Sequence, residues 1–373
     1  MVGLIDLVQT LTTPHPLDRY LELVRPTLTA RDMRAEITHV DRSVPESVTL
    51  TLRPTRQWRG HAAGQYVQIG VVIDGVRHRR CYSPIDVAGR RDRQIQLTVK
   101  AHPNGLVSRY LHRTAAPGMV VDLTPAAGVF RLPDTRPDRV VLIGGGSGIT
   151  PVLSMMRTLA DEGYRGDLTF LYYAQAPELV PHRVQLTALA ERFENFRVEL
   201  RYPGHSARGS ERLGRGAGEP SARLEGAARY FDYDELAHVA PWFADAQTFM
   251  CGPPGLMNAV RKVYEAEQLA DRLHSEEFTL SVPPVDAGEA FGTVSFSGSG
   301  ISTANDGAVL LEQAEAAGLT PEFGCRMGIC FSCTAVRRTG CTRNVRTGET
   351  DSDPDQPIQL CVSAPVGDVD IDI

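Results

Sequence analysis

The chain has 373 residues, which exceeds one typical domain and predicts two or three. Its composition, 42% apolar and 23% charged, is that of a globular protein, and no apolar stretch approaches the roughly 18 residues of a membrane span. The N-terminus lacks the basic region of a signal peptide, and Asp6 interrupts its apolar run. Because seven cysteines are an odd number, we expect no disulfide framework and a cytoplasmic protein.

The net charge of −6 is unevenly distributed along the chain. From Val285 onward there are thirteen acidic residues, five arginines and no lysine, a local charge of −8. An acidic surface of this kind steers association with basic protein partners, although a solvated face without a partner has the same composition. The segment gives no support to nucleic-acid binding, which uses clustered Lys and Arg.

Residues 1–32 are expected to form a leader with three prolines and a short apolar pattern. The pattern, between Leu17 and Val24, predicts one or two helical turns that pack on the body of the protein. Contact with a membrane is a second interpretation of the same apolar residues.

Residues 33–135 predict an antiparallel β-barrel. Short runs of alternating polarity are separated by turn signals such as Asp74-Gly75 and Pro117-Gly118, and evenly spaced strands of this kind are typical of barrels. The expected strands are Ala35–Val40, Val48–Arg53, Gln65–Ile73, Ile95–Lys100 and Met119–Leu123.

One strand of this barrel ends in Arg80-Cys-Tyr82-Ser83-Pro84, and its residue types have uses against a flavin. The Tyr82 ring can lie on the isoalloxazine, the Arg80 guanidinium can pair with a phosphate, and the Ser83 hydroxyl can donate toward N5. Downstream, Gly105-Leu-Val-Ser108 begins a predicted helix whose unpaired N–H groups, with the serine hydroxyl, suit a pyrophosphate and favour FAD over FMN. Because Arg and Tyr on a strand also pack without a ligand, the flavin prediction depends on both motifs together.

Residues 136–280 alternate strand and helix patterns, which predicts a small doubly wound α/β domain. Val140–Ile143 is a continuous apolar run, as a buried parallel strand requires. Residues 203–227 interrupt the alternation with a Gly-, Ser- and Arg-rich stretch that predicts a mobile surface loop. The other expected elements are the helices Pro151–Ala160, His182–Phe193 and Leu256–Gln268 and the strands Leu168–Ala174, Phe196–Arg201 and Gln247–Met250.

A glycine loop, Gly144-Gly145-Gly146-Ser147-Gly148-Ile-Thr150-Pro151, follows the buried strand and begins a helix. Its glycines let a dinucleotide approach the backbone, and the helix N-terminus suits a pyrophosphate, although a plain tight turn has similar glycines. Cys251-Gly252-Pro253-Pro254 repeats the order of strand, glycine and helix at a later strand. There Cys251 would face the nicotinamide, whereas a lone cysteine is more often a small core residue.

The last part of the chain, residues 288–373, follows a proline-containing linker at 281–287 and holds four spaced cysteines. Cys325, Cys330 and Cys333 form C-x4-C-x2-C and Cys361 follows at a distance, which is the spacing of a plant-type [2Fe–2S] ferredoxin. Zinc sites more often have paired C-x2-C knuckles, so zinc or incidental thiols are the alternatives. Cys341 is a rival fourth ligand, but only seven residues separate it from Cys333.

These motifs, taken in their order along the chain, resemble the ferredoxin–NADP⁺ reductase superfamily with a C-terminal ferredoxin domain. The resemblance covers residues 33–373 and implies three parts: a flavin barrel, an α/β nucleotide domain and an α+β (β-grasp) ferredoxin domain. It implies Ser83, Cys251 and Glu277 as catalytic residues, although the register of Glu276-Glu277-Phe278 with the family's terminal Glu-x-Phe stays open. Further cofactor-binding residues that it implies are Val99, Lys100 and Val107.

The resemblance implies an NAD(P)H-dependent oxidoreductase. A nicotinamide cofactor would give a hydride to FAD, which would release electrons singly to the cluster and then to an external acceptor protein. Gly64-Gln-Tyr66-Val67 is similar to reductases of membrane di-iron desaturases and alkane hydroxylases, so the chain would associate with a membrane through that partner. A reductase of a Rieske-type oxygenase shares every motif, and a non-catalytic redox sensor is the alternative from another class.

The choice between NADH and NADPH depends on charges near the ribose. NADP-preferring relatives usually place a basic residue just after the second sheet strand, where this chain has Gln175, with Glu178 nearby. Arg201 and Arg183 are candidate substitutes that could pair with a 2′-phosphate. Because the basic residue is absent from its usual place, we expect NADH.

Overall fold

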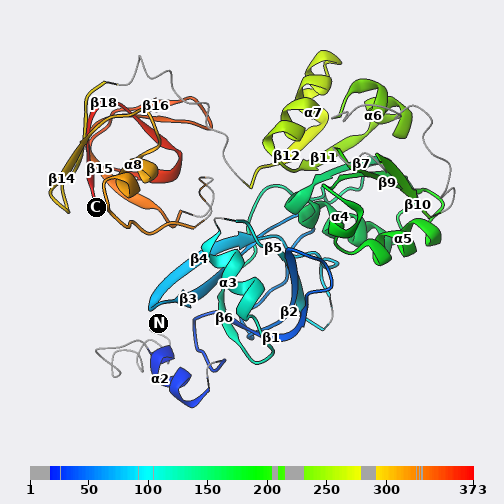
Figure 1. The fold of residues 1–373 in the computed structure, drawn as a ribbon, viewed down its shortest axis with the longest axis horizontal. Helices are drawn as coiled ribbons and strands as arrows, with labels where there is room; N and C mark the ends of the chain where they lie inside the picture. The colour runs from blue at the N-terminus through cyan, green and yellow to red at the C-terminus, as the bar shows by residue number, and fades with distance from the viewer. Residues whose placement is uncertain are drawn as a thin grey trace. The chain divides into compact units, whose positions relative to one another are not determined.

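The computed structural model describes residues 17–25, 27–90, 92–103, 105–203, 209–214, 231–278, 291–324, 326, 328 and 331–373 (Figure 1). The chain divides into two compact units, Met1–Glu277 and Phe278–Ile373. The division falls close to the linker predicted at 281–287, which lies outside the described residues.

The leader contains helix α2, Leu17–Val24, which confirms the one or two predicted helical turns. Asp18 is buried and accepts hydrogen bonds from the backbone N–H groups of Ala30, Arg31 (3.0 Å) and Asp32 (2.8 Å). These bonds satisfy the buried carboxylate and hold the helix against the segment that enters the barrel. No helix in the described part of the chain is long and apolar enough to cross a membrane.

The first sheet forms the predicted antiparallel barrel, in the strand order β4-β3-β6-β1-β2-β5. A bridge between Pro84 and Leu97 brings the end of β4 to β5, so the two edges of the sheet meet. β4 is the strand that was expected to end in the Arg-x-Tyr-Ser motif; its many charged residues hide the alternation, so its bounds were not predicted. The strands are β1 (Arg34–Asp41), β2 (Ser47–Pro54), β3 (Val67–Ile73), β4 (Val76–Tyr82), β5 (Ile95–Lys100) and β6 (Val120–Leu123).

Helix α3, Leu106–Thr114, covers this barrel and begins directly after Gly105. It buries Val107 and Leu111 in the same apolar core as Ile37 and Leu97. The predicted helix at the Gly-Leu-Val-Ser motif is therefore confirmed.

The second sheet has the order β10-β9-β8-β7-β11-β12 and is parallel apart from the β10–β9 pair. Helices α4 and α5 lie on one face and α6 and α7 on the other (Figure 1). This confirms the predicted doubly wound domain. The strands are β7 (Arg139–Gly145), β8 (Asp167–Tyr173), β9 (Phe196–Arg201), β10 (Ser210–Leu213), β11 (Gln247–Cys251) and β12 (Leu273–Glu276). The helices are α4 (Ile149–Asp161), α5 (Arg183–Arg192), α6 (Tyr233–Val239) and α7 (Pro254–Ala266).

The apolar run at Val140–Ile143 is buried on both sides, as its composition predicted. Val140 and Leu142 join the core under α4 and α5, whereas Val141 and Ile143 join the core under α6 and α7. Successive strand residues point to opposite faces, so a strand covered on both faces needs an unbroken apolar run.

The prediction of a mobile loop at 203–227 is wrong for one part of this segment. Ser210–Leu213 is strand β10, paired antiparallel with β9. Leu213 is buried, and Glu211 forms an ion pair with Arg183 of α5. The prediction failed because these contacts are long-range and the Gly- and Ser-rich flanks dominate the local composition; residues 204–208 and 215–230 lie outside the described residues.

The second unit holds a mixed sheet in the order β14-β13-β18-β15-β16, with β17 also paired to β15. β13 and β18 run parallel, and the other pairs are antiparallel. Helix α8, Leu310–Ala316, packs its apolar residues on this sheet, in one core with Phe296 and Ile371. The strands are β13 (Thr293–Phe296), β14 (Ile301–Ala304), β15 (Thr334–Asn344), β16 (Thr350–Asp351), β17 (Gln356–Gln359) and β18 (Ser363–Asp372).

Candidate active site

The predicted flavin motif lies at the end of β4, where Ser83 is almost completely buried. Its exposed fraction is 1%, and its Oγ has no hydrogen-bond partner among the described residues. A buried hydroxyl without a partner destabilises a protein by about 1–3 kcal/mol. The site therefore fits a bound group that makes a hydrogen bond at this oxygen. Tyr82 packs at the edge of the barrel core, where burial raises the pKa of its hydroxyl, and Arg80 is half-buried beside it.

The Gly-Leu-Val-Ser motif is a tight turn in which the serine hydroxyl already has partners. Ser108 Oγ donates to the carbonyl of Gly105 (3.3 Å) and accepts from the N–H of His102 (3.3 Å). A side chain at Gly105 would collide with this hydroxyl in its present position. The first N–H groups of α3 remain the donors that could meet a phosphate.

Other cofactor-binding residues expected on the barrel have different exposures. Val99 and Val107 are each 1% exposed and lie in the barrel core, so only their backbone atoms can meet a ligand. Lys100, at the end of β5, is partly exposed, and its Nζ lies 4.0 Å from a carboxylate oxygen of Glu46. Its ammonium is the one of these three side chains that can reach a charged ligand.

The two predicted nucleotide motifs meet at the carboxyl ends of neighbouring parallel strands. Gly144 of β7 pairs in register with Cys251 of β11. A side chain at Gly148 would collide with the carbonyl of Cys251, and one at Gly145 would lie 2.7 Å from the Pro253 ring. Glycine is required where the backbones approach this closely.

The carboxyl edge of these strands is open to a ligand. Residues Gly146–Gly148 form a single 3-10 turn between β7 and α4. Gly146 and Ser147 are half-buried, and Thr150 Oγ1 donates to the carbonyl of Ser147 (3.2 Å). Gly252, in the facing motif, is also half-buried. The turn thus presents backbone groups at the place where doubly wound sheets bind ligands.

Cys251 lies beside a buried carboxyl group that the sequence analysis did not select. β11 and β12 are parallel, and Cys251 pairs in register with Glu276. Burial raises the pKa of Glu276 to about 8, and its Oε2 has no hydrogen-bond partner in the described part of the chain. Burial, with the neighbouring carboxylates Glu276 and Glu277, raises the pKa of the Cys251 thiol well above its usual value. Both groups are therefore neutral near pH 7.

Glu277, the expected catalytic acid, is in a different environment. Its carboxylate forms an ion pair with Arg261 of α7, and both side chains are about a third exposed. Glu276 is the first residue of Glu276-Glu277-Phe278, so the Glu-x-Phe pattern itself was the signal that could have selected it.

The two candidates for a 2′-phosphate contact, Arg201 and Arg183, are both already paired with acidic side chains. Arg201 is 4% exposed and forms ion pairs with Glu199 (3.0 Å) and Glu235. Arg183 is paired with Glu211. Gln175 is exposed just after β8, so it is placed to meet a ligand but carries no charge.

Two of the four predicted cluster ligands are described. Cys333 and Cys361 are buried in one core of the second unit, whereas Cys325 and Cys330 lie outside the described residues. The N–H of Gly328 donates to Cys361 Sγ (3.3 Å), a contact that stabilises a thiolate. Among the described residues no group of side chains forms a metal site, so the cluster stays a prediction.

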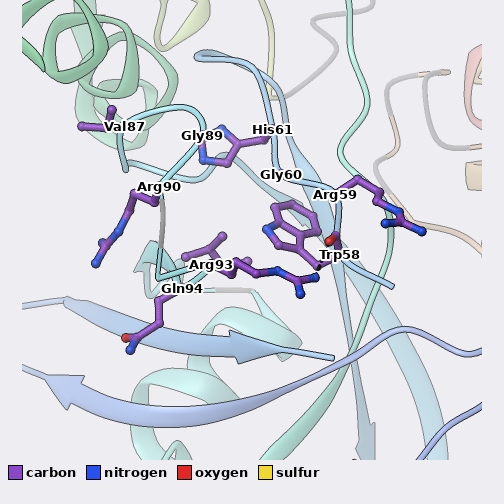
Figure 2. Close-up of a pocket in the computed structure, with 10 residues that line it drawn as sticks. Trp58, Arg59, Gly60, His61, Val87, Gly89, Arg90, Arg93 and Gln94 are labelled. Carbon is purple, nitrogen blue, oxygen red and sulfur yellow. Dashed lines mark hydrogen bonds between the residues drawn. The ribbon is translucent and has the colours of Figure 1, made fainter. Parts of the chain in front are cut away.

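A cavity of about 320 Å³ on the barrel is lined by a different set of residues (Figure 2). Trp58 and His61 line it, and Arg93 donates to the Trp58 carbonyl (2.6 Å). In Figure 2 the side chains of Arg59 and Arg90 point away from each other rather than toward a common point. The cavity contains none of the predicted site residues, so it is not the expected redox site.

Comparison with known proteins gives the family. Residues 37–132 match the oxidoreductase FAD-binding domain, and residues 142–262 match the oxidoreductase NAD-binding domain. An NADPH oxidoreductase of Mycobacterium tuberculosis is 36% identical over 368 residues, covering 97% of this chain and 90% of the relative. The chain belongs to the ferredoxin reductase family of oxidoreductases. The expected enzyme class, with its FAD-binding barrel and NAD-binding α/β domain, is thereby confirmed.

Other members of the ferredoxin reductase family are similar over most of their length. The glycine betaine monooxygenase reductase subunit of Pseudomonas aeruginosa is 30% identical, covering 83% of this chain and 86% of the relative. The structure of phthalate dioxygenase reductase matches with a TM-score of 0.60, covering 91% of this chain and 97% of that one. At 24% identity this second likeness concerns the fold alone.

Proposed function

We propose that this reductase passes electrons from NADH through FAD and a [2Fe–2S] cluster, one at a time, to an external oxygenase or desaturase. The observation that carries the first step is the position of the glycine turn Gly146–Gly148, which contacts β5 of the barrel. The nucleotide loop thus borders the domain that would hold FAD, as direct hydride transfer requires.

The protein residues would bind and orient the cofactors. When bound, the nicotinamide supplies a hydride and FAD a carrier that accepts two electrons and releases them singly. Ser83 would donate a hydrogen bond at flavin N5, with the Tyr82 ring on the isoalloxazine and Arg80 on a phosphate. The glycine turn would hold the nucleotide pyrophosphate. The buried Cys251 and Glu276 would border the nicotinamide, exclude water, and hold a proton on the Glu276 carboxyl near pH 7.

The second unit would hold the cluster. Its mixed sheet, with one parallel pair and a covering helix, has the arrangement expected of the predicted β-grasp fold. Cys333 and Cys361 are both buried in its core, and the C-x4-C-x2-C spacing supplies the other two ligands. A cluster of this type has a potential near −400 mV, low enough to reduce iron-dependent acceptors.

The acceptor is proposed from the relatives. Two of them are named as reductases of a glycine betaine monooxygenase and a stachydrine N-demethylase, which favours an oxygenase component as the partner. A membrane desaturase or alkane hydroxylase is the second candidate, since Gly64-Gln-Tyr66-Val67 resembles reductases of that class. Single-turnover reduction of each purified acceptor by this reductase would distinguish the two.

The electron path can be tested with a chain that ends at residue 282. Such a chain keeps the barrel and the nucleotide domain, so it should still reduce ferricyanide with NADH at the full-length rate. It should lose most activity with cytochrome c, because single-electron exit would need the cluster. Equal cytochrome c rates in the two proteins would contradict the path.

A further inference from the structure

Helix α4 forms direct hydrogen bonds with the segment that follows the flavin motif. Ser154 Oγ donates to the carbonyl of Asp86 (2.7 Å), and Arg157 Nη1 donates to the carbonyl of Ile85 (2.8 Å). At the next residue, Thr158, Oγ1 accepts a hydrogen bond from the N–H of Ala88 (3.1 Å). The three side chains are spaced i, i+3 and i+4, so they lie on one face of the helix.

We propose that Ser154, Arg157 and Thr158 are positioning residues that fix the nicotinamide site relative to the flavin site. The proposal rests on the proposed hydride transfer and adds the residues that set its geometry. Side chains on α4 would define where the flavin motif lies, and the start of the same helix would define where the nucleotide lies.

The place of α4 in the fold supports this role. The helix begins at Ile149, directly after the glycine turn, and Ser154 is five residues later, about 7 Å along the axis. The segment it binds, Ile85–Ala88, follows Ser83 after a single proline. One helix therefore joins the two predicted cofactor sites within three turns.

The bonds are of a kind that fixes backbone position. Each joins an α4 side chain to a main-chain group, and Ser154 and Thr158 are 0% and 2% exposed. Buried hydrogen bonds of this type cannot be replaced by water, so a shift of the barrel against the helix would leave buried polar groups unpaired. Two facing cofactors need atoms about 3–3.5 Å apart for transfer, and a shift of about 1 Å can slow a reaction a hundredfold.

Arg157 is partly buried, at a site that disfavours its charge. Burial lowers the pKa of its guanidinium to about 10, which measures how strongly the site disfavours the charge. Besides Ile85 it donates to Gln185 of α5, so one cation connects the barrel segment with two helices of the nucleotide domain. Apolar residues often stabilise such a site better than a charge, which favours a positional role for this one.

A second link between the barrel and the nucleotide domain lies on β5. His182, just before α5, has its Nε2 2.7 Å from Thr98 Oγ1, and Thr98 Oγ1 is 3.0 Å from Thr49 Oγ1. Thr98 immediately precedes Val99, one of the expected cofactor-binding residues. With contacts at β5 and at Ile85–Ala88, the barrel is held against the sheet domain at two separate points, which opposes both sliding and rotation.

The test uses the full-length flavoprotein with the double substitution Arg157→Met and Thr158→Val. Flavin content and the dissociation constant for NAD⁺ should stay within twofold of wild type, because no proposed ligand contact is removed. Flavin reduction at saturating NADH in stopped flow should slow by roughly ten- to a hundredfold. The long-wavelength absorbance of the flavin–nicotinamide contact should weaken, and amide exchange at Ala88 should rise.

Matched controls separate positioning from general damage. Thr187→Val removes a hydroxyl that bonds within α5, to the Arg183 carbonyl (3.0 Å), and should leave the reduction rate unchanged. Thr98→Val should slow reduction, whereas Thr49→Val, which keeps the His182 contact, should not. A double variant whose Ala88 amide exchanges faster while flavin reduction stays at the wild-type rate would overturn the proposal. A wild-type protein that NADH does not reduce would instead overturn the proposed function.

Discussion

Cys251 and Glu276 occupy paired positions at the ends of adjacent parallel strands, and both are buried. Burial raises the pKa of the carboxyl to about 8 and that of the thiol well above its usual value. The edge of the sheet that would meet the nicotinamide therefore carries two neutral polar groups near pH 7. The carboxylate of the next residue, Glu277, forms an ion pair with Arg261.

We expect Glu276→Gln to change how stability depends on pH. The pKa of Glu276 is about 8 in the folded protein and about 4.5 in the unfolded chain, so the folded state holds an extra proton between these values. Its contribution to stability is complete below about pH 4.5 and is lost as the pH rises through 8. Thermal unfolding from pH 5 to 9 should show a smaller loss of Tm in Glu276→Gln than in wild type. An equal loss of Tm in the two proteins would contradict the assignment.

We expect Ser83→Ala to slow the reduction of the flavin without lowering the Tm of the flavin-free protein. Because Ser83 Oγ has no partner among the described residues, its removal should leave the Tm of the flavin-free protein unchanged or slightly higher. In the flavin-loaded protein, NADH should reduce the flavin roughly ten- to a hundredfold more slowly, since one contact at N5 is lost. A lower Tm without flavin would show that the hydroxyl has a structural partner, and an unchanged reduction rate would exclude the proposed contact.

We expect Cys361→Ser to lose the iron and Cys341→Ser to keep it. Cys361 lies in the core of the second unit beside the Gly328 N–H, whereas Cys341 is on strand β15 and pairs in register with Val366 of β18. Iron and labile sulfide are measured on purified protein, with two of each expected per chain in wild type. The opposite pattern of loss would reassign the fourth ligand to Cys341.

We expect NADH to be preferred and Gln175→Arg to weaken that preference. Gln175 is exposed after β8 and uncharged, so an arginine there could pair with a 2′-phosphate. One charge-assisted hydrogen bond contributes about 1.5 kcal/mol, which corresponds to roughly a tenfold rise in kcat/KM for NADPH. Steady-state kinetics of wild type and Gln175→Arg with NADH and with NADPH measure this change in kcat/KM. A wild-type preference for NADPH would show that the phosphate is bound by other residues.

Arg201→Ala is expected to act on stability rather than on cofactor choice. The substitution leaves Glu235 without its arginine, whereas Glu199 keeps Arg197 and Arg212, so we expect a loss of about 3 kcal/mol, the lower end for a broken buried pair. Denaturant unfolding should show this loss while the ratio of kcat/KM for NADH and NADPH stays constant. A collapse of NADPH activity in a stable Arg201→Ala protein would restore Arg201 as a phosphate contact.

The sequence by itself predicted most elements of the barrel and of the α/β domain, and the order of the motifs. Period-two alternation predicted most barrel strands, and the apolar run at Val140–Ile143 predicted a strand covered on both faces, because these patterns depend on neighbours in the chain. The two strand–glycine–helix motifs that the sequence predicted lie together, since the carboxyl ends of parallel strands lie at one edge of a sheet.

Only the tertiary structure decided which charged side chains are available to contact a cofactor. The sequence suggested Arg201 as a contact for a 2′-phosphate. In the structure its guanidinium is paired with two acids, one two residues away and one 34 residues away. Glu276 and Glu277 are adjacent and chemically identical, and only the pairing of β12 with β11 buries one and leaves the other to Arg261. Strand β10 and the contacts of α4 with Ile85–Ala88 likewise depend on residues distant in the chain. Ion pairs, burial and side chain-to-backbone bonds are set by spatial neighbours, which a local pattern does not contain.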